Sequence, residues 1–162
     1  MQFLLVVTGI IVILVIFVWI IICHTSDGYD RMSFRETMDL CELPIVTFTN
    51  NSKKFNFLLD TGASKSIINK TVLEELEYER LNKETSLYGS EGNRQTVPFI
   101  KMSVGYRDRY YEEEFQVVDM SSAFGNLKSD YGVNLHGILS STFFQKYKYI
   151  LDFDALIAYS MK

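Results

Sequence analysis

Apolar and polar residues divide the chain into three parts. An apolar, uncharged run covers residues 3–22, interrupted only by a threonine and a glycine. A polar and irregular segment follows, and after it short apolar runs alternate with turn-forming residues. We therefore predict a transmembrane anchor over residues 1–23, a juxtamembrane linker over 24–41 and a folded domain over 42–162.

The apolar run is about 20 residues long, which matches the hydrocarbon thickness of a bilayer. The alternative is a cleaved secretory signal, but the run is longer than a usual signal core, no Lys or Arg precedes it, and no small-x-small cleavage site follows it. A buried core helix is disfavoured because the run has no polar face. We expect a single-pass membrane protein. Arg31 and Arg35 slightly favour a cytoplasmic soluble domain, so the side of the membrane stays open.

Short strands separated by turn signals dominate the remainder of the chain, and helical periodicity is rare. This pattern predicts a closed all-β barrel with one or two short helices. The predicted strands are 43–49, 54–60, 67–68, 85–88, 95–104, 110–118, 135–139, 149–153 and 156–159. Short helices are predicted at 71–76 and 141–146, and a helical turn is predicted at 121–127.

The strand that ends at Asp60 carries the strongest candidate for chemistry. Phe55 and Phe57 alternate with a polar residue, and then Leu58 and Leu59 are both apolar, as in a strand that enters a core covered on both faces. Asp60 therefore lies where a central strand ends. It is followed by Thr61, Gly62, Ala63 and Ser64, which are small enough for a tight turn. The alternative is an ordinary turn in which Asp60 only caps backbone N–H groups.

The stretch Phe57-Leu58-Leu59-Asp60-Thr61-Gly62-Ala63-Ser64 resembles the active-site loop of aspartic peptidases. About 75 residues later come an apolar strand with a glycine, a short helix and a final strand pair, over residues 135–153. This order resembles the retropepsin-like family, and the likeness covers roughly residues 42–160. Membrane-anchored, single-domain members of this kind occur in bacteria, and this chain resembles them. One departure is Ser140, where the family usually has glycine.

The resemblance implies an aspartic endopeptidase with Asp60 as its catalytic residue. Asp152 and Asp154 are not followed by Thr/Ser-Gly, so the chain supplies one such carboxylate. In the family, an identical subunit supplies the second, which implies a homodimer. Two carboxyl groups about 3 Å apart share one proton, and together they activate a water molecule against the peptide carbonyl.

The resemblance also implies roles for the neighbours. Thr61 would bond across the two-fold axis, Gly62 would let the substrate backbone approach, and Ala63 and Ser64 would keep the turn small. A flap would close over a peptide or protein substrate. Its predicted residues are Tyr88, Gly89, Ser90 and Gly92, for which an ordinary hairpin end is the alternative.

Composition limits the remaining possibilities. The net charge is −4, with no basic excess, so a nucleic-acid partner is not expected. Cys23, Cys41, His24 and His136 are isolated, so neither a metal nor a cofactor is expected. The acidic run 112–114 is interpreted as a solvated hairpin edge. A catalytically silent retropepsin-like module, used for dimerisation or peptide binding at the membrane, is the alternative function, and Ser140 is the feature that favours it.

Overall fold

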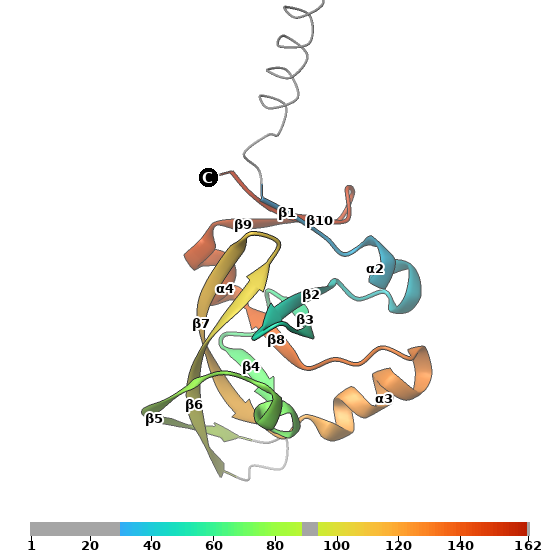
Figure 1. Cartoon of the computed structure of the whole chain (residues 1–162). Coiled ribbons are helices and arrows are strands. Elements are labelled where there is room, and N and C mark those ends of the chain that lie inside the picture. The colour runs from blue at the N-terminus through green and yellow to red at the C-terminus, as the bar shows by residue number, and fades with distance from the viewer. Residues whose placement is uncertain (1–29, 89–93, 162) are drawn as a thin grey trace, which may run out of the picture. The chain divides into compact units, whose positions relative to one another are not determined.

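A closed ring of six β-strands forms the centre of the computed structural model, which describes residues 30–88 and 94–161 (Figure 1). The ring order is β2-β3-β8-β4-β7-β6, and a pairing between Thr49 and Gly105 joins β6 back to β2. Strand β5 (Glu79–Tyr88) pairs with β6 outside the ring. The ring strands are β2 (Ile45–Asn50), β3 (Lys53–Asp60), β4 (Ser66–Asn69), β6 (Arg94–Tyr106), β7 (Arg109–Val118) and β8 (Gly137–Ser140). The predicted closed barrel is thus confirmed.

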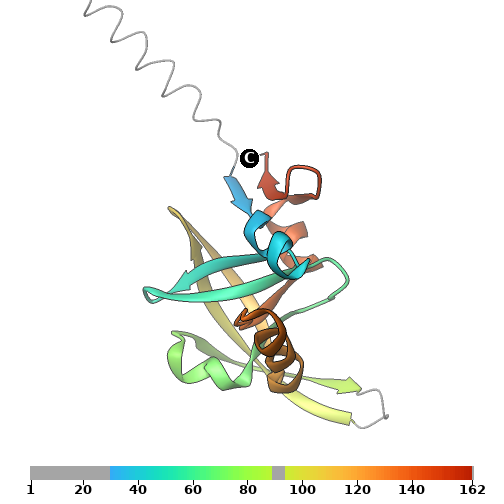
Figure 2. The same ribbon diagram turned by 90° about the vertical axis from the view of Figure 1, so that its right-hand side faces the viewer.

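Short helices connect the strands. A 3-10 helix, Lys70–Glu75, follows β4, and α4 (Ser141–Tyr147) follows β8, both close to their predicted positions. The helix α3 (Ser121–Tyr131) is longer than the predicted turn and ends at Gly132, whose φ of 71° suits glycine. Helices α2 and α3 lie on the same side of the barrel (Figure 2).

The boundary predicted for the linker is wrong at residues 30–41. These residues form β1 (Asp30–Ser33) and α2 (Arg35–Cys41), and the compact unit begins at Asp30. Met32 and Phe34 are fully buried, although polar residues surround them in the sequence. The strand partner of β1 is β10, near the other end of the chain. A pattern confined to one short segment could not reveal a pairing over that separation.

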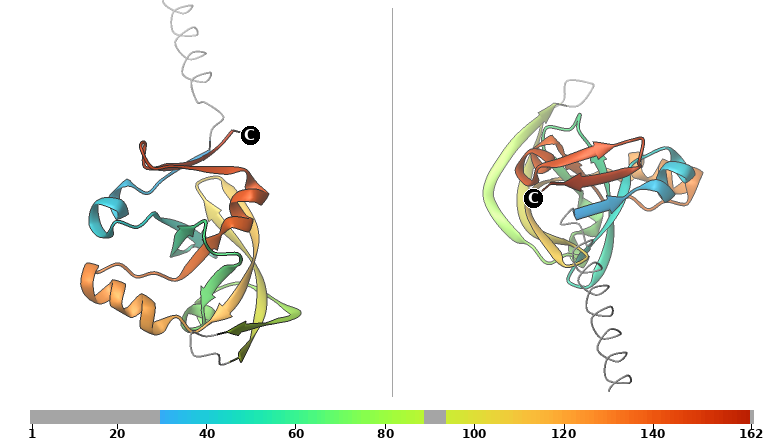
Figure 3. Two further views of the ribbon diagram at one scale, coloured as in Figure 1. Left: turned by 180° about the vertical axis from the view of Figure 1, so that it is seen from behind. Right: turned by 90° about the horizontal axis from the view of Figure 1, so that it is seen from above.

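Strands β1, β10 (Ile157–Ser160) and β9 (Tyr149–Asp152) form a separate three-stranded antiparallel sheet in the described part of the chain. This sheet covers one end of the barrel (Figure 3). The predicted transmembrane helix over 1–23 lies outside the described residues. Residues 30–88 and 94–161 contain no helix with the length and hydrophobicity of a membrane span.

Aromatic side chains fill the space between the barrel and α4. Phe143 of α4 is fully buried, stacks on Tyr149 with ring centroids 5.9 Å apart, and meets Phe48 and Tyr111 at 6.3 and 5.5 Å. The hydroxyls of Tyr111 and Tyr149 lie 2.7 Å apart, so these buried polar groups satisfy each other. Burial of these rings holds α4 against the barrel. The helix can therefore serve as a fixed support for the loop that it touches.

Three central strands position the candidate site. Strand β3 runs parallel to β8, with Asp60 opposite Ser140, and β8 also pairs with β4. Leu59 and Leu139 in these strands are buried. Because β3 and β8 are parallel, their carboxyl ends lie at the same edge. The prediction that Asp60 lies at the exit of a central strand is confirmed.

Candidate active site

The loop after β3 turns back on its own acid. The backbone N–H of Gly62 donates to Asp60 Oδ1 at 2.8 Å, and the N–H of Ala63 donates to the Asp60 carbonyl at 3.3 Å. A side chain at position 62 would place its Cβ 3.2 Å from Asp60 Oδ1, which is tighter than ordinary contact. Glycine therefore leaves room for the carboxylate. One carboxylate oxygen is fixed by the loop, and the side chain is half-buried.

Helix α4 holds the far side of the same loop. Both the backbone N–H and the hydroxyl of Ser141 donate to the Ala63 carbonyl, at 3.0 and 2.9 Å. The Ala63 side chain packs against the smaller apolar cluster, which includes Ile45 and Ile138. Ser141 was not among the predicted site residues. Its sequence context carries no signal for this contact, because the two residues meet only when β8 pairs with β3.

The outer surface of the loop is open in the single chain. Thr61, Gly62 and Ser64 are exposed, whereas Ala63 is half-buried. Their predicted roles at a two-fold axis and toward substrate remain predictions. The geometry brings Asp60, Thr61, Gly62, Ala63 and Ser64 together in one turn at the end of β3.

Ser140 fits the position where the resemblance leads one to expect glycine. Its backbone is extended, with φ −91° and ψ 176°, which any residue can adopt. The side chain is fully buried, and its hydroxyl lies 3.2 Å from the Ser66 hydroxyl and 2.7 Å from that of Thr142. The departure from glycine therefore causes no backbone strain and leaves no unpaired buried hydroxyl.

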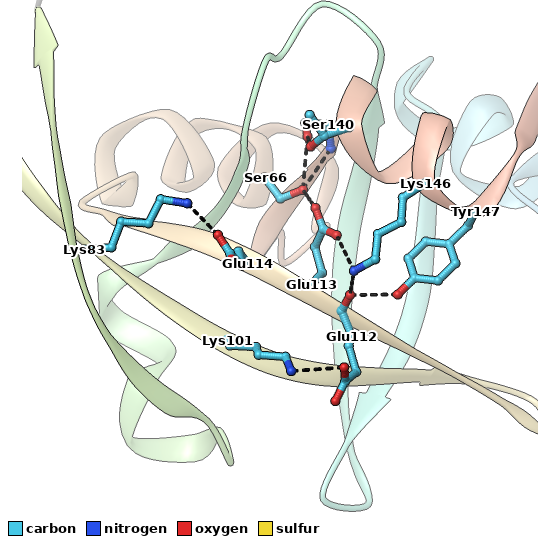
Figure 4. Close-up of polar contacts among 10 residues, drawn as sticks. Ser66, Lys83, Lys101, Glu112, Glu113, Glu114, Ser140, Lys146 and Tyr147 are labelled. Atoms are coloured by element: carbon cyan, nitrogen blue, oxygen red, sulfur yellow. Dashed lines mark hydrogen bonds and ion pairs between the residues drawn. The ribbon is translucent and has the colours of Figure 1, made fainter.

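The acidic run contains a buried member, so the prediction of a solvated edge is wrong for Glu113. This residue is 5% exposed, and its Oε1 accepts a hydrogen bond of 2.9 Å from the Ser66 hydroxyl (Figure 4). Its Oε2 lies 3.8 Å from Nζ of Lys146. Alternation along β7 carried the signal, because Tyr111, Glu113 and Phe115 share one face, and both aromatic residues are buried.

The two neighbours of Glu113 point outward, as predicted for a solvated edge. Glu112 pairs with Lys101 at 3.0 Å and Glu114 with Lys83 at 2.7 Å, and all four side chains are well exposed (Figure 4). Exposed pairs of this kind contribute little to stability. They provide matched surface controls for any change at Glu113.

Burial raises the pKa of the Glu113 carboxyl above its ordinary value of 4.5, and the Ser66 hydrogen bond and the Lys146 charge oppose this shift. The folded chain thus binds this proton more tightly than the unfolded chain. The resulting stabilisation is fully present below the unfolded pKa and is lost as pH rises through the folded pKa. Glu113→Gln stays neutral and can still accept from Ser66. We expect the variant to gain stability relative to the unchanged chain as pH rises through this window.

Urea unfolding at several values between about pH 4 and about pH 8 would measure this difference. Glu112→Gln is the control, because that side chain is exposed, and its stability should follow the unchanged chain more closely. A Glu113→Gln difference that stays constant with pH would contradict the prediction.

The predicted flap corresponds to a β-hairpin. Strands β5 and β6 pair from Glu79 and Lys101 out to Tyr88 and Arg94. The strands are longer than predicted, since β5 begins at Glu79 rather than residue 85. Gly89, Ser90 and Gly92 lie outside the described residues, so the flap role of this tip and of Tyr88 stays a prediction.

Comparison with known proteins agrees with this geometry. Residues 46–105, which include the Asp60 loop, match the family model described as "gag-polyprotein putative aspartyl protease". The fold is similar to a solved structure, a retropepsin-like aspartic protease from Rickettsia conorii, with a TM-score of 0.55 and 17% sequence identity. The similarity covers 82% of this chain and 91% of that chain. No match was found among curated proteins.

A closed six-stranded barrel with an Asp-Thr-Gly-Ala-Ser turn at the end of a central strand defines an aspartyl protease, a class of peptide-bond hydrolase. Within that class, the matched segment is that of an aspartyl protease family model, and the fold is that of a retropepsin-like protease. At 17% identity, the solved structure supports the fold, and the family model covers the segment that contains the Asp60 loop.

Proposed function

We propose that this chain is a membrane-tethered, homodimeric aspartic endopeptidase in which each subunit contributes one Asp60. The observation that carries the proposal is the turn at the end of β3. There a half-buried carboxylate is oriented by the Gly62 N–H, while the surrounding loop surface is exposed. Such a loop can meet a second copy of itself and a peptide.

The mechanism follows from two such carboxylates placed side by side. Close like charges cannot both ionise, so the pair holds one proton. The ionised Asp60 accepts a proton from a water molecule, which attacks the peptide carbonyl carbon. The protonated Asp60 of the other subunit donates to the carbonyl oxygen. The amide bond then breaks without a covalent enzyme intermediate, by general acid–base catalysis.

The need for a second subunit rests on the roles of the other acids after β8. Asp152 Oδ1 accepts the backbone N–H groups of Asp154 and Ala155, at 3.0 and 2.9 Å, so it organises the turn between β9 and β10. Asp154 is exposed at the same turn. Neither follows the Asp-Thr-Gly pattern. A two-fold dimer supplies the second carboxylate with a single sequence.

Mixing subunits tests the dimer directly. Unchanged chain and Asp60→Asn chain, mixed in equal amounts and allowed to exchange, should give about one quarter of full specific activity when subunits pair at random. Independent subunits would give about half. Peptide hydrolysis in detergent solution, measured against total chain concentration, is the readout. About half of the activity, unchanged by dilution, would refute the shared site.

Tethering is supported by the apolar run 3–22, which ends only a few residues before the folded unit begins at Asp30. A membrane anchor confines two subunits to one plane and raises their effective concentration. Alkaline extraction should leave the full chain with the membrane and release a chain that begins at residue 24. Release of the full chain would contradict tethering.

An extended peptide is the proposed substrate, bound as a strand beneath the β5–β6 hairpin. Turnover of a peptide library at mildly acid pH tests this, and a complete lack of cleavage would favour a silent module. Ser140 no longer favours that alternative, because its backbone does not require glycine.

A further inference from the structure

A buried carboxylate lies behind the catalytic loop, on the barrel side. We propose that Glu113 is a positioning residue that fixes the Asp60 loop through the hydroxyls of Ser66 and Ser140. This inference rests on the proposed peptidase function, because it assigns Glu113 a part in that reaction. Glu113 does not touch substrate in this proposal and acts only through the two serines.

The first link joins Glu113 to the end of the loop. Ser66 is the first residue of β4, immediately after the loop that begins at Asp60. Its side chain is 1% exposed, and its hydroxyl donates to Glu113 Oε1 at 2.9 Å. This burial also excludes Ser66 as a nucleophile toward a peptide. In this proposal, the Ser66 hydroxyl instead supports the Asp60 loop.

The second link joins Ser66 to the strand beside Asp60. Ser66 Oγ accepts the backbone N–H of Ser140 at 3.2 Å, and the two hydroxyls are also 3.2 Å apart (Figure 4). Ser140 lies opposite Asp60 in the β3–β8 pairing, and the next residue, Ser141, holds the Ala63 carbonyl. Glu113 is thus connected to both ends of the loop through two side chains.

Donor counting shows why an acceptor is needed at position 113. Ser66 has one hydroxyl proton and two acceptor sites. The proton goes to Glu113 Oε1, and one acceptor site takes the N–H of Ser140. With its only proton on Glu113, Ser66 can be only the acceptor in its contact with the Ser140 hydroxyl. Without this acceptor, the Ser66 proton is left unpaired in a buried site, or it turns toward Ser140 and reverses that contact.

Charge around the carboxylate comes from several elements. Lys146 of α4 lies 3.8 Å from Oε2, while Lys65 of the loop and Glu114 of β7 exert weaker opposite effects on it. The Lys146 ammonium also donates to the Glu112 backbone carbonyl. The proposal itself depends on the acceptor at Oε1, and a neutral acceptor should therefore substitute for it.

The consequence for catalysis is geometric. Small misplacements of catalytic groups by about 1 Å can cost about 100-fold in rate. In the full-length chain, Glu113→Ala should lower kcat by about 10- to 100-fold with KM changed by less than about threefold. Glu113→Gln should keep kcat within about threefold, because its amide oxygen accepts from Ser66. Glu112→Ala, one residue away on the exposed face, should behave like the unchanged chain.

A double-mutant cycle tests whether Glu113 acts through Ser66. Ser66→Ala should lower kcat, and adding it to Glu113→Ala should cause little further loss, because both changes break the same link. Equal losses in Glu113→Ala and Glu113→Gln, or additive losses with Ser66→Ala, would overturn the proposal. A change in KM alone would also overturn it.

Amide hydrogen exchange separates this proposal from the proposed function. Loop amides at residues 61–66 should exchange faster in Glu113→Ala than in Glu112→Ala, whether or not peptide is cleaved. Absence of turnover by the unchanged chain would refute the peptidase assignment. Equal exchange in the two variants would refute support of the loop by Glu113.

Discussion

Replacing Asp60 by Asn is expected to lower kcat for peptide hydrolysis by about 10²- to 10⁴-fold while the chain stays folded. An amide can neither accept the proton of the attacking water nor donate one as a carboxylic acid does. The amide oxygen can still accept the Gly62 N–H that Asp60 Oδ1 accepts at 2.8 Å. The local turn should therefore survive. Peptide hydrolysis and thermal unfolding of both chains measure the two parts of this prediction.

Asp108→Asn is the matched control. Asp108 is exposed in the turn between β6 and β7, and both Asp and Asn suit turns. This variant loses the same charge but should keep full activity. Undiminished hydrolysis by Asp60→Asn, at the same purity, would exclude Asp60 as the catalytic acid. Loss of folding in that variant would show that the carboxylate is needed for the turn itself.

Gly137→Ala is expected to destabilise the chain by about 3 kcal/mol, the upper end for overpacked cores. A Cβ at this position would lie 2.5 Å from the Ile67 carbonyl oxygen and 2.7 Å from Cε1 of Phe57. The carbonyl belongs to the backbone of β4, which pairs with β8, so it cannot move aside without disturbing that pairing. Urea unfolding measures the change, and reduced kcat is expected as well because β8 adjoins Asp60.

Gly125→Ala provides the contrast. Gly125 lies within α3, and nothing would come within 4 Å of an added Cβ. Alanine is favoured over glycine inside helices, so this variant should gain up to about 1 kcal/mol. Similar unfolding free energies for the two variants would mean that β8 can shift to accept a methyl group at Gly137.

The Asp60 loop was predictable because its signal is local. A strand that becomes wholly apolar before Asp60 predicts a buried strand end, and the small residues after Asp60 predict a tight turn. The first part of the domain was not predictable in this way. Met32 and Phe34 are isolated apolar residues in a polar segment, and their burial depends on β10. The burial of Glu113 could in principle be predicted from the sequence, since alternation with Tyr111 and Phe115 places it inward.

The chain sequence alone predicted the class of fold, Asp60 as the candidate for the chemistry, and the order of the elements around it. Each of these follows from side-chain patterns within a few residues of one another. Tertiary structure alone decided what lies behind the loop. Ser66, Glu113 and the continuous β8–α4 stretch that carries Ser140 and Lys146 are three separate segments. They meet only because β3, β4, β7 and β8 pair in this register and α4 packs beside them. Hydrogen bonds between distant segments leave no periodic trace in a sequence.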